Sequence, residues 1–347
     1  MVLKHDDIHA ILRAYFKPPI DVLKCKKIGV GYIHSTYELS IDRGLFILQQ
    51  FNSGVFPNIA SVNQNINSLA DHLTTHNYPR QIISVLPTRT QSTYFKKNEH
   101  HYRLLNFIPH AICYDHIPNT EIAYNASAAF GEWHVYTSTY PTAKLQPVLP
   151  DFINFKYRIQ LLKQAVVQSD TYKLKKSRKL LHTIESNIKL LTAFTQAIDQ
   201  QSLTTKVIHA DPKISNVLFH KSSSEVAAII DLDTIIPGPI LIDFGEMIRS
   251  YTNPSAEDDP NNINVFSTDI HAAVMDGFLQ YVGHLLTPTD KIWLPEVGKV
   301  ITLIQSMRFL TDYLDGNIYY PVSHPDQNLD RTHNQINVFK SMLTVPK

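Results

Sequence analysis

The first hundred residues follow a hydrophobic pattern that predicts a small sheet with helices beside it. Apolar side chains recur at helical spacing ahead of Pro18-Pro19, and Asp6 and Asp7 precede them as candidate N-caps. Further along, short alternating runs bounded by turn residues are typical of strands. The predicted elements are strands at 37–41, 45–48, 82–86 and 101–108, a hairpin turn at 42–44 and a helix at 58–77. This part of the chain is therefore expected to form a β-rich lobe.

Beyond Pro109 the pattern becomes mainly helical, with apolar stripes opposite charged faces. Two adjacent segments, 206–219 and 226–236, interrupt the helices and are expected to be β-rich. The predicted helical stretches are 121–138, 157–170, 174–200, 267–286 and 293–315. The whole pattern predicts an α+β chain with a small β-rich N-lobe at 1–105 and a larger, mostly helical C-lobe at 106–347.

Composition narrows the function classes. A chain of 347 residues has room for about two domains or one two-lobed unit, and 44% hydrophobic with 18% charged residues are globular proportions. The net charge of +1 creates no overall field that would recruit nucleic acid or an acidic membrane. Two cysteines, Cys25 and Cys113, can form neither a disulfide framework nor a four-ligand zinc site. With no signal-peptide pattern and no bilayer-length apolar run, we expect a soluble, cytoplasmic protein without nucleic-acid or membrane partners.

The segment 207–219 and the strand after it carry the most specific chemical pattern. A predicted strand leads into Asp211, and Lys213 and Asn216 follow two and five residues later. A second predicted strand ends at Asp231. Phosphoryl transfer from ATP needs such a set: a carboxylate to accept the proton of the attacking hydroxyl, and hard oxygen ligands for Mg²⁺. We assign Asp211 as the base and Asn216 with Asp231 as metal ligands. Lys213 would offset charge on the transferring phosphoryl group.

Residues near this segment have structural explanations as well as functional ones. Asp211 precedes Pro212 and, on its own, would fit an ordinary turn. His209 is expected to brace the loop as a buried imidazole. Asp243 lies in an apolar segment, where a carboxylate needs several donors, and is expected to accept hydrogen bonds from loop amides. Asp233 is expected either to face the substrate or to cap a turn.

The loop His209-Ala-Asp-Pro-Lys-Ile-Ser-Asn216 resembles the catalytic loop of the aminoglycoside phosphotransferase and choline kinase superfamily, whose members are relatives of protein kinases. Further segments resemble the N-acetylhexosamine 1-kinases within that superfamily: 46–52, 230–238, 243–249 and 308–320. The resemblance implies a bilobal protein-kinase-like fold that uses ATP and Mg²⁺. It also implies a sugar as substrate, phosphorylated on the anomeric hydroxyl of an N-acetylhexosamine to give a sugar 1-phosphate.

The same resemblance assigns a nucleotide site. Segment 104–108 would be the hinge, with Leu105 and Phe107 holding the adenine. Gly29 and Gly31 would belong to the loop that covers the phosphates, although a third glycine is missing. Gln49 stands where many kinases carry a strand lysine for the α- and β-phosphates, so phosphate charge would rest on Mg²⁺, Lys213 and backbone amides.

For the acceptor side the sequence leaves two accounts of Arg308. It lies four residues before Asp312 in a predicted helix, where an exposed ion pair is the simplest explanation. By resemblance, Arg308 instead points into the cleft to bind the sugar, with Tyr319 as a wall. The segment 149–154 lacks a histidine that relatives often have after the phenylalanine, which weakens the inference about substrate more than that about reaction type.

Two alternatives remain at this point. The same reaction on choline, an amino-alcohol, an aminoglycoside or a thiosugar would keep the catalytic loop. Cationic substrates need carboxylates or aromatic cages, and outside the loop the obvious acidic cluster is 257–259, in a predicted surface loop. A pseudokinase-like binding module without turnover would fit the missing cation at Gln49-Gln50, but not the intact Asp211, Asn216 and Asp231.

Overall fold

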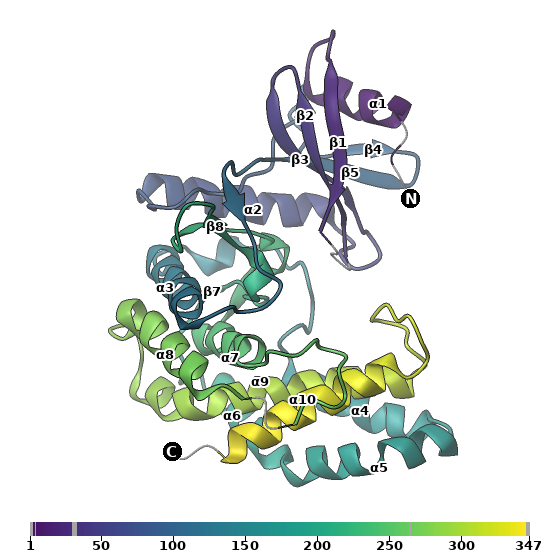
Figure 1. Cartoon of the computed structure of the whole chain (residues 1–347), viewed down its shortest axis with the longest axis vertical. Helices are drawn as coiled ribbons and strands as arrows, with labels where there is room; N and C mark the ends of the chain where they lie inside the picture. Colours follow the sequence, from purple (N-terminus) through teal and green to yellow (C-terminus); the bar gives the residue numbers. More distant parts are fainter. Residues whose placement is uncertain (1–2, 4, 30–32, 264–265, 345–347) are drawn as a thin grey trace.

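A computed structural model describes residues 3, 5–29, 33–263 and 266–344. The N-terminal part is a five-stranded antiparallel sheet in the order β1-β2-β3-β5-β4, with helix α1 packed beside it (Figure 1). These elements are α1 (His5–Tyr15), β1 (Val22–Ile28), β2 (Ser35–Ile41), β3 (Gly44–Phe51), β4 (Phe95–Lys97) and β5 (His100–Asn106). The predicted hairpin is confirmed, since β2 and β3 pair directly around the turn at 42–43.

Helix α2 (Ile59–Thr75) lies between this sheet and the helical part of the chain (Figure 1). Asn58 caps it by accepting a hydrogen bond from the Ser61 amide at 3.1 Å. The apolar face of α2 joins the larger of two hydrophobic clusters, which extends through the helical part, whereas α1 and the other face of the sheet form the smaller cluster. The two cores therefore do not divide at one point along the chain.

The remainder is mostly helical, with two small sheets, β7–β10 and β6–β8–β9, embedded in it. Helices α3 and α8 pack closely because Gly131 and Gly277 face the opposing backbone, where an added Cβ would lie 2.7 Å from Phe278 O and 2.4 Å from Tyr124 O. The helices are α3 (Thr120–Thr137), α4 (Phe155–Gln168), α5 (Thr171–Ser186), α6 (Ile188–Asp199), α7 (Ile240–Tyr251), α8 (Thr268–Val282), α9 (Pro288–Leu314) and α10 (Gln327–Thr344). The strands are β6 (Ala111–Ile112), β7 (Thr205–Ile208), β8 (Val217–His220), β9 (Val226–Ile229) and β10 (Ile236–Pro239).

Several predicted elements differ in the structure. Segment 82–86 is not a strand but makes a single bridge from Val85 to β5. Side chains replace the missing ladder: Asn106 bonds to Ser84 N and Ile82 O, and Asn67 bonds to both backbone groups of Val85. The predicted helix at 174–200 is two helices that meet at Asn187. Helices α7 and α10 were not predicted.

The N-terminal helix begins earlier than predicted. Asp6 and Asp7 lie within the first turn of α1 and do not cap the helix from outside. Their negative charges lie near the positive end of the helix dipole, which is a favourable interaction. Among the described residues, no helix is long and apolar enough to cross a membrane.

Candidate active site

The predicted catalytic loop (209–216) leaves β7 after Ile208 and returns through a short 3-10 turn (Ile214–Asn216) into β8. Its first two residues are held from α7, because the fully buried Asp243 carboxylate accepts hydrogen bonds from the His209 and Ala210 amides, both at 2.7 Å. Ala210 has φ of 66°, a left-handed conformation that is strained for a residue with a Cβ. Two charge-assisted hydrogen bonds stabilise this turn and so direct the next residue, Asp211, away from the core.

His209 is buried, and its ring bonds to backbone groups within the described part of the chain. Its Nδ1 accepts the Asp211 amide at 3.2 Å, which places a ring proton on Nε2, and Nε2 donates to Ile230 O at 2.9 Å. Because Ile230 directly follows β9 and His209 directly follows β7, this ring links the ends of the two strands. Thr234 adds a third tie, donating to His209 O at 2.7 Å.

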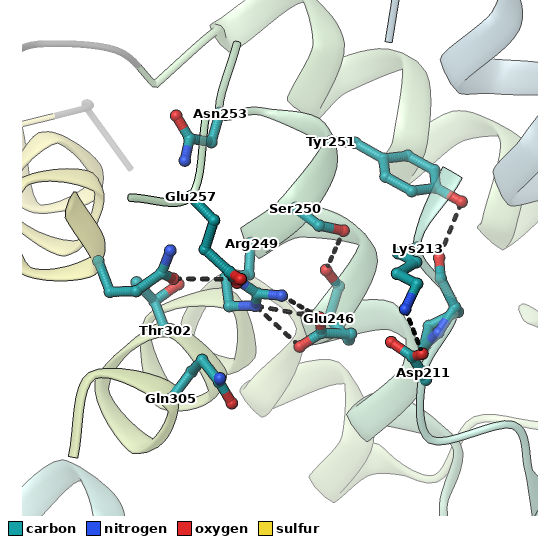
Figure 2. Close-up of polar contacts among 12 residues, drawn as sticks. Asp211, Lys213, Glu246, Arg249, Ser250, Tyr251, Asn253, Glu257, Thr302 and Gln305 are labelled. Carbon is teal, nitrogen blue, oxygen red and sulfur yellow. Dashed lines mark hydrogen bonds and ion pairs between the residues drawn. The ribbon is translucent and has the colours of Figure 1, made fainter. Parts of the chain in front are cut away.

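Asp211, Lys213 and Asn216 lie together, as the spacing predicts. Lys213 Nζ lies 2.8 Å from Asp211 Oδ2 (Figure 2), and Asn216 Nδ2 donates to the same oxygen at 3.2 Å and to Asp211 O at 2.9 Å. The Asp211 carboxylate raises the pKa of Lys213, so this lysine is protonated at neutral pH. Among the described residues nothing donates to Asp211 Oδ1, which leaves that oxygen available to a hydroxyl.

Asp231 has the features of a metal ligand. It adopts a left-handed conformation (φ 63°) after β9, and none of the described residues donates a hydrogen bond to its carboxylate. Burial raises its pKa, and the negative charge of Asp233 adds to this effect. Asn216 Oδ1 likewise receives no donor from the described chain. Among the described residues, no group of three or more His, Cys, Asp or Glu side chains is arranged to hold a metal ion. Two protein oxygens nevertheless suit Mg²⁺, which keeps waters and phosphate oxygens as its other ligands.

Asp233 does not lie on an open substrate-facing surface. It is 2% exposed, and both carboxylate oxygens lie 2.7 Å from Arg103 Nη2 on β5. His34 Nε2 lies 2.7 Å from Asp233 Oδ2. These partners lower the pKa of Asp233 to about 2 despite its burial. The turn therefore carries this side chain into a buried ion pair with the N-terminal sheet, and in this structure the Asp233 carboxylate does not face an open surface.

The predicted nucleotide residues lie along the sheet. Gly29 has a φ of 70°, which favours glycine, at the end of β1. Gly31 lies outside the described residues. Leu105 is buried near the end of β5. Phe107 follows the strand, and its backbone N–H and C=O make no hydrogen bond to the described residues. Gln49 is occupied at both ends of its amide: it accepts from Arg103 Nε at 2.8 Å and donates to Thr36 Oγ1 at 3.2 Å.

Arg308 and Asp312 do not form the exposed pair. Asp312 is buried and its carboxylate accepts the backbone amides of residues 318, 319 and 320 at 2.8, 2.7 and 2.9 Å, which shapes the loop after α9. Arg308 is half-buried, donates to Gln305 Oε1 at 3.0 Å and lies over the rings of Phe152 and Tyr320. Tyr319, at the tip of the loop, is 52% exposed.

A charge cluster not predicted from the sequence, here called the α7 charge cluster, surrounds Arg249 on α7 (Figure 2). Glu246 lies on the same helix and is largely buried, whereas Glu257 lies in the loop after α7 and is exposed. Arg249 Nε donates to both Glu246 oxygens, at 3.0 and 2.9 Å, and Nη1 donates to Glu257 Oε1 at 3.2 Å and to Gln335 Oε1 at 3.1 Å. Burial raises the pKa of Glu246, partly opposed by Arg249, and Asp211 is near enough to add to the rise. The spacing of Glu246 and Arg249 on one helix was visible in the sequence, but their burial was not.

Comparisons with known proteins concern the family and the fold of the chain. A family profile described as the phosphotransferase enzyme family matches residues 24–273. A spectinomycin phosphotransferase solved with ADP and spectinomycin is similar in structure, with a TM-score of 0.65 and 12% identity over 99% of each chain. An aminoglycoside phosphotransferase from Alicyclobacillus acidocaldarius has a TM-score of 0.63 and 13% identity, over 96% of this chain and 95% of that one. A microcompartment-associated aminopropanol kinase has a TM-score of 0.60 and 13% identity, over 94% and 93%.

These matches define a kinase-like phosphotransferase, and the expected α+β, protein-kinase-like fold is confirmed. Since the family profile covers well over half of the sequence, the chain belongs to the phosphotransferase enzyme family.

Proposed function

We propose that this protein transfers the γ-phosphoryl group of Mg-ATP to the anomeric hydroxyl of an N-acetylhexosamine. The observation that carries the acceptor class is the charge balance beside the catalytic loop. Glu246 is paired through both oxygens with Arg249, which also donates to one oxygen of the exposed Glu257, and Arg308 adds a further cation nearby. A polycationic acceptor requires free carboxylates or an aromatic cage. A neutral acceptor rich in hydroxyl and carbonyl groups fits this balance better, and the resemblance of segment 308–320 supports a sugar.

The chemical step is supported by the two unequal oxygens of Asp211. Oδ2 is held by Lys213 and Asn216, whereas Oδ1 would accept a hydrogen bond from the acceptor hydroxyl. As that hydroxyl oxygen attacks, a bond forms to the γ-phosphorus and the bond to the β–γ bridging oxygen breaks, its electron pair leaving with ADP. The hydroxyl proton passes to Asp211. Lys213, protonated beside Asp211, would offset negative charge as it develops on the phosphoryl group.

The nucleotide would lie between the lobes at 1–105 and 106–347, with its adenine at Leu105 and the backbone of Phe107. Asn216 and Asp231 would hold Mg²⁺, which supplies charge neutralisation to the phosphates when bound. The structural neighbours solved with ADP support nucleotide use. Arg308 and Tyr319 would contact the sugar, because Asp312 fixes the loop that presents Tyr319 beside the α9 helix. We expect the enzyme to act in the cytoplasm, where ATP is available.

The test is an ADP-release assay with Mg-ATP and a panel of acceptors. The panel contains N-acetylglucosamine, N-acetylgalactosamine, glucose, galactose, choline, 1-amino-2-propanol and spectinomycin, with Asp211→Asn as the blank. We expect turnover of the acetamido sugars, and a product that mild acid hydrolyses as it does an anomeric phosphate. Turnover of only an amino-alcohol or aminoglycoside would keep the catalytic loop and reject the sugar. Nucleotide binding without any turnover would favour a binding module, the alternative that Gln49 in place of a strand cation supports.

A further inference from the structure

Arg103 lies in a buried polar cluster that links four segments of the chain. It is 1% exposed on β5, directly opposite Gln49 on β3 in the sheet register. Nε donates to Gln49 Oε1 and Nη1 to Asn63 Oδ1 on α2, both at 2.8 Å, while Nη2 holds both Asp233 oxygens at 2.7 Å. A guanidinium spreads five donors over three nitrogens in a fixed plane and so reaches partners on different sides, whereas the three donors of a lysine ammonium radiate from one nitrogen.

The far side of Asp233 is occupied as well. His34 Nδ1 accepts the Asn52 amide at 3.0 Å, so the ring proton is on Nε2 and donates to Asp233 Oδ2 at 2.7 Å. The His34 ring stacks on Phe51, with centroids 4.6 Å apart and planes inclined by 19°. Asp233 is therefore held by Arg103 on β5 and by His34, the residue before β2, although it belongs to the turn (Leu232–Thr234) directly after Asp231.

We propose that Arg103 is a positioning residue for the Asp231 metal ligand, acting through Asp233, and that it takes the structural place of the missing strand cation without touching the nucleotide. Asp231 itself has no donor among the described residues, so its orientation depends on the turn that carries it. That turn is fixed at two points, two and three residues after Asp231: Arg103 holds Asp233, and Thr234 donates to His209 O. This inference rests on the proposed function.

The geometry also excludes a direct phosphate contact by Arg103 as the structure stands. Its three nitrogens are committed to Gln49, Asn63 and Asp233, and its side chain is almost wholly buried. To reach a phosphate, Arg103 would have to leave Asp233 buried without its ion-pair partner. Partners of metal ligands act by fixing the ligand's orientation, and removing them typically lowers metal affinity or activity by about 10–100-fold.

The experiment measures binding of the ATP analogue AMP-PNP by calorimetry, with Mg²⁺ and with EDTA, in Arg103→Gln and Arg103→Lys. Arg80→Gln is the matched control, because Arg80 also bridges a half-buried carboxylate and a backbone oxygen, Glu132 at 2.7 Å and Val226 O at 2.6 Å. We expect Arg103→Gln to weaken binding in Mg²⁺ by about 10–100-fold, with binding in EDTA unchanged. Arg80→Gln should lower thermal stability alone. Arg103→Lys keeps the charge, and with it the fold, but should also weaken Mg²⁺-dependent binding.

Two results would overturn the proposal. The first is AMP-PNP affinity in Mg²⁺ equal to that of wild type in a folded Arg103→Lys. The second is an equal loss of AMP-PNP affinity in Mg²⁺ and in EDTA, which would mean that Arg103 contacts the nucleotide. Hydrogen exchange of the amides at 209–211 and 231–235 provides a readout that needs no ligand. Exchange there should accelerate in the Arg103 variants and not in Arg80→Gln, and equal rates would contradict the proposal. If the wild-type protein binds no AMP-PNP at all, the proposed function fails, whereas the exchange measurement still decides the role of Arg103.

Discussion

The predicted catalytic loop and the α7 charge cluster differ in whether their carboxylates are paired with donors. In the loop region, Asp211 keeps one oxygen without a donor and Asp231 keeps both, among the described residues. In the α7 cluster, Glu246 and Glu257 are paired with Arg249. The two regions are close enough for Asp211 to influence the pKa of Glu246. Burial and proximity alone therefore do not identify the carboxylates available for chemistry.

In the loop region the backbone is held by hydrogen bonds, whereas Asp211 Oδ1 and the Asp231 carboxylate receive no donor from the described residues. Asp243 holds the amides of His209 and Ala210, and His209 ties the loop to Ile230. The Asp243 carboxylate, which supports the loop, has its donors within the protein. The oxygens without donors are those to which a hydroxyl or a cation could bind. The predictions below test this division, from the largest expected effect to the smallest.

The largest effect is expected at Asp211. Replacing it with Asn removes the proton acceptor but keeps a side chain of the same size, so kcat should fall by about 10²–10⁴-fold while AMP-PNP still binds. Steady-state kinetics and calorimetry measure the two quantities. The matched control is Glu257→Gln, a carboxylate paired with Arg249 and outside the loop. A comparable loss of kcat in both variants would erase the distinction between the regions.

The second effect concerns stability. Arg249→Met would leave the Glu246 carboxylate buried without its partner, and we expect unfolding free energy to fall by about 3–5 kcal/mol. Chemical denaturation followed by circular dichroism measures the change. Lys24→Met is the control, because it breaks an exposed pair with Glu38 and should change stability by about 0–1 kcal/mol. Equal effects in the two variants would show that the α7 cluster is no more than a surface network.

Asp243→Asn tests the support of the loop. The amide group can accept from one of the two backbone donors but presents its own N–H groups to the other, so we expect a loss of about 1.5–3 kcal/mol in stability. The strained Ala210 should then relax, and kcat should fall with it. Hydrogen exchange at His209 and Ala210 reports the loop directly. Unchanged protection of both amides would mean that other contacts hold this turn.

The smallest effect is a pH dependence. Burial raises the pKa of Glu246 in the folded state above its ordinary value, so between those two values the folded protein binds more protons than the unfolded chain. The contribution of Glu246 to stability is therefore fully present below its ordinary pKa and is lost as the pH rises through the folded value. Unfolding free energy of wild type relative to Glu246→Gln should increase as the pH falls from 7 towards 4. A difference independent of pH would show that Arg249 fully offsets the burial.

Much of this site could be predicted because its parts are contiguous in the sequence. Asp211, Lys213 and Asn216 lie within one loop, and short-range geometry brings them together whatever the rest of the chain does. The helices with long apolar stripes were predicted for a similar reason. Segment 82–86 was predicted wrongly because Asn67 and Asn106, distant in sequence, take over its backbone hydrogen bonds.

The partners of Asp233, Arg308 and Asp312 could not be predicted. Asp233 pairs with Arg103, 130 residues earlier in the chain, and Asp312 turns to the amides of the following loop instead of to Arg308. A sequence shows which residues carry charge. It does not show which of several possible partners, equally spaced or equally charged, will lie against a given charged residue in the folded core.

The sequence by itself determined the reaction class, since hydroxyl activation and metal binding need particular side chains at short spacings along two strand ends. Tertiary structure alone decided which carboxylates remain open and which are neutralised. The physical reason is that a buried carboxylate must find donors or a cation wherever the fold supplies them. Arg103 is the donor to Asp233 and Arg249 is the donor to Glu246, whereas the Asp231 carboxylate has no donor among the described residues.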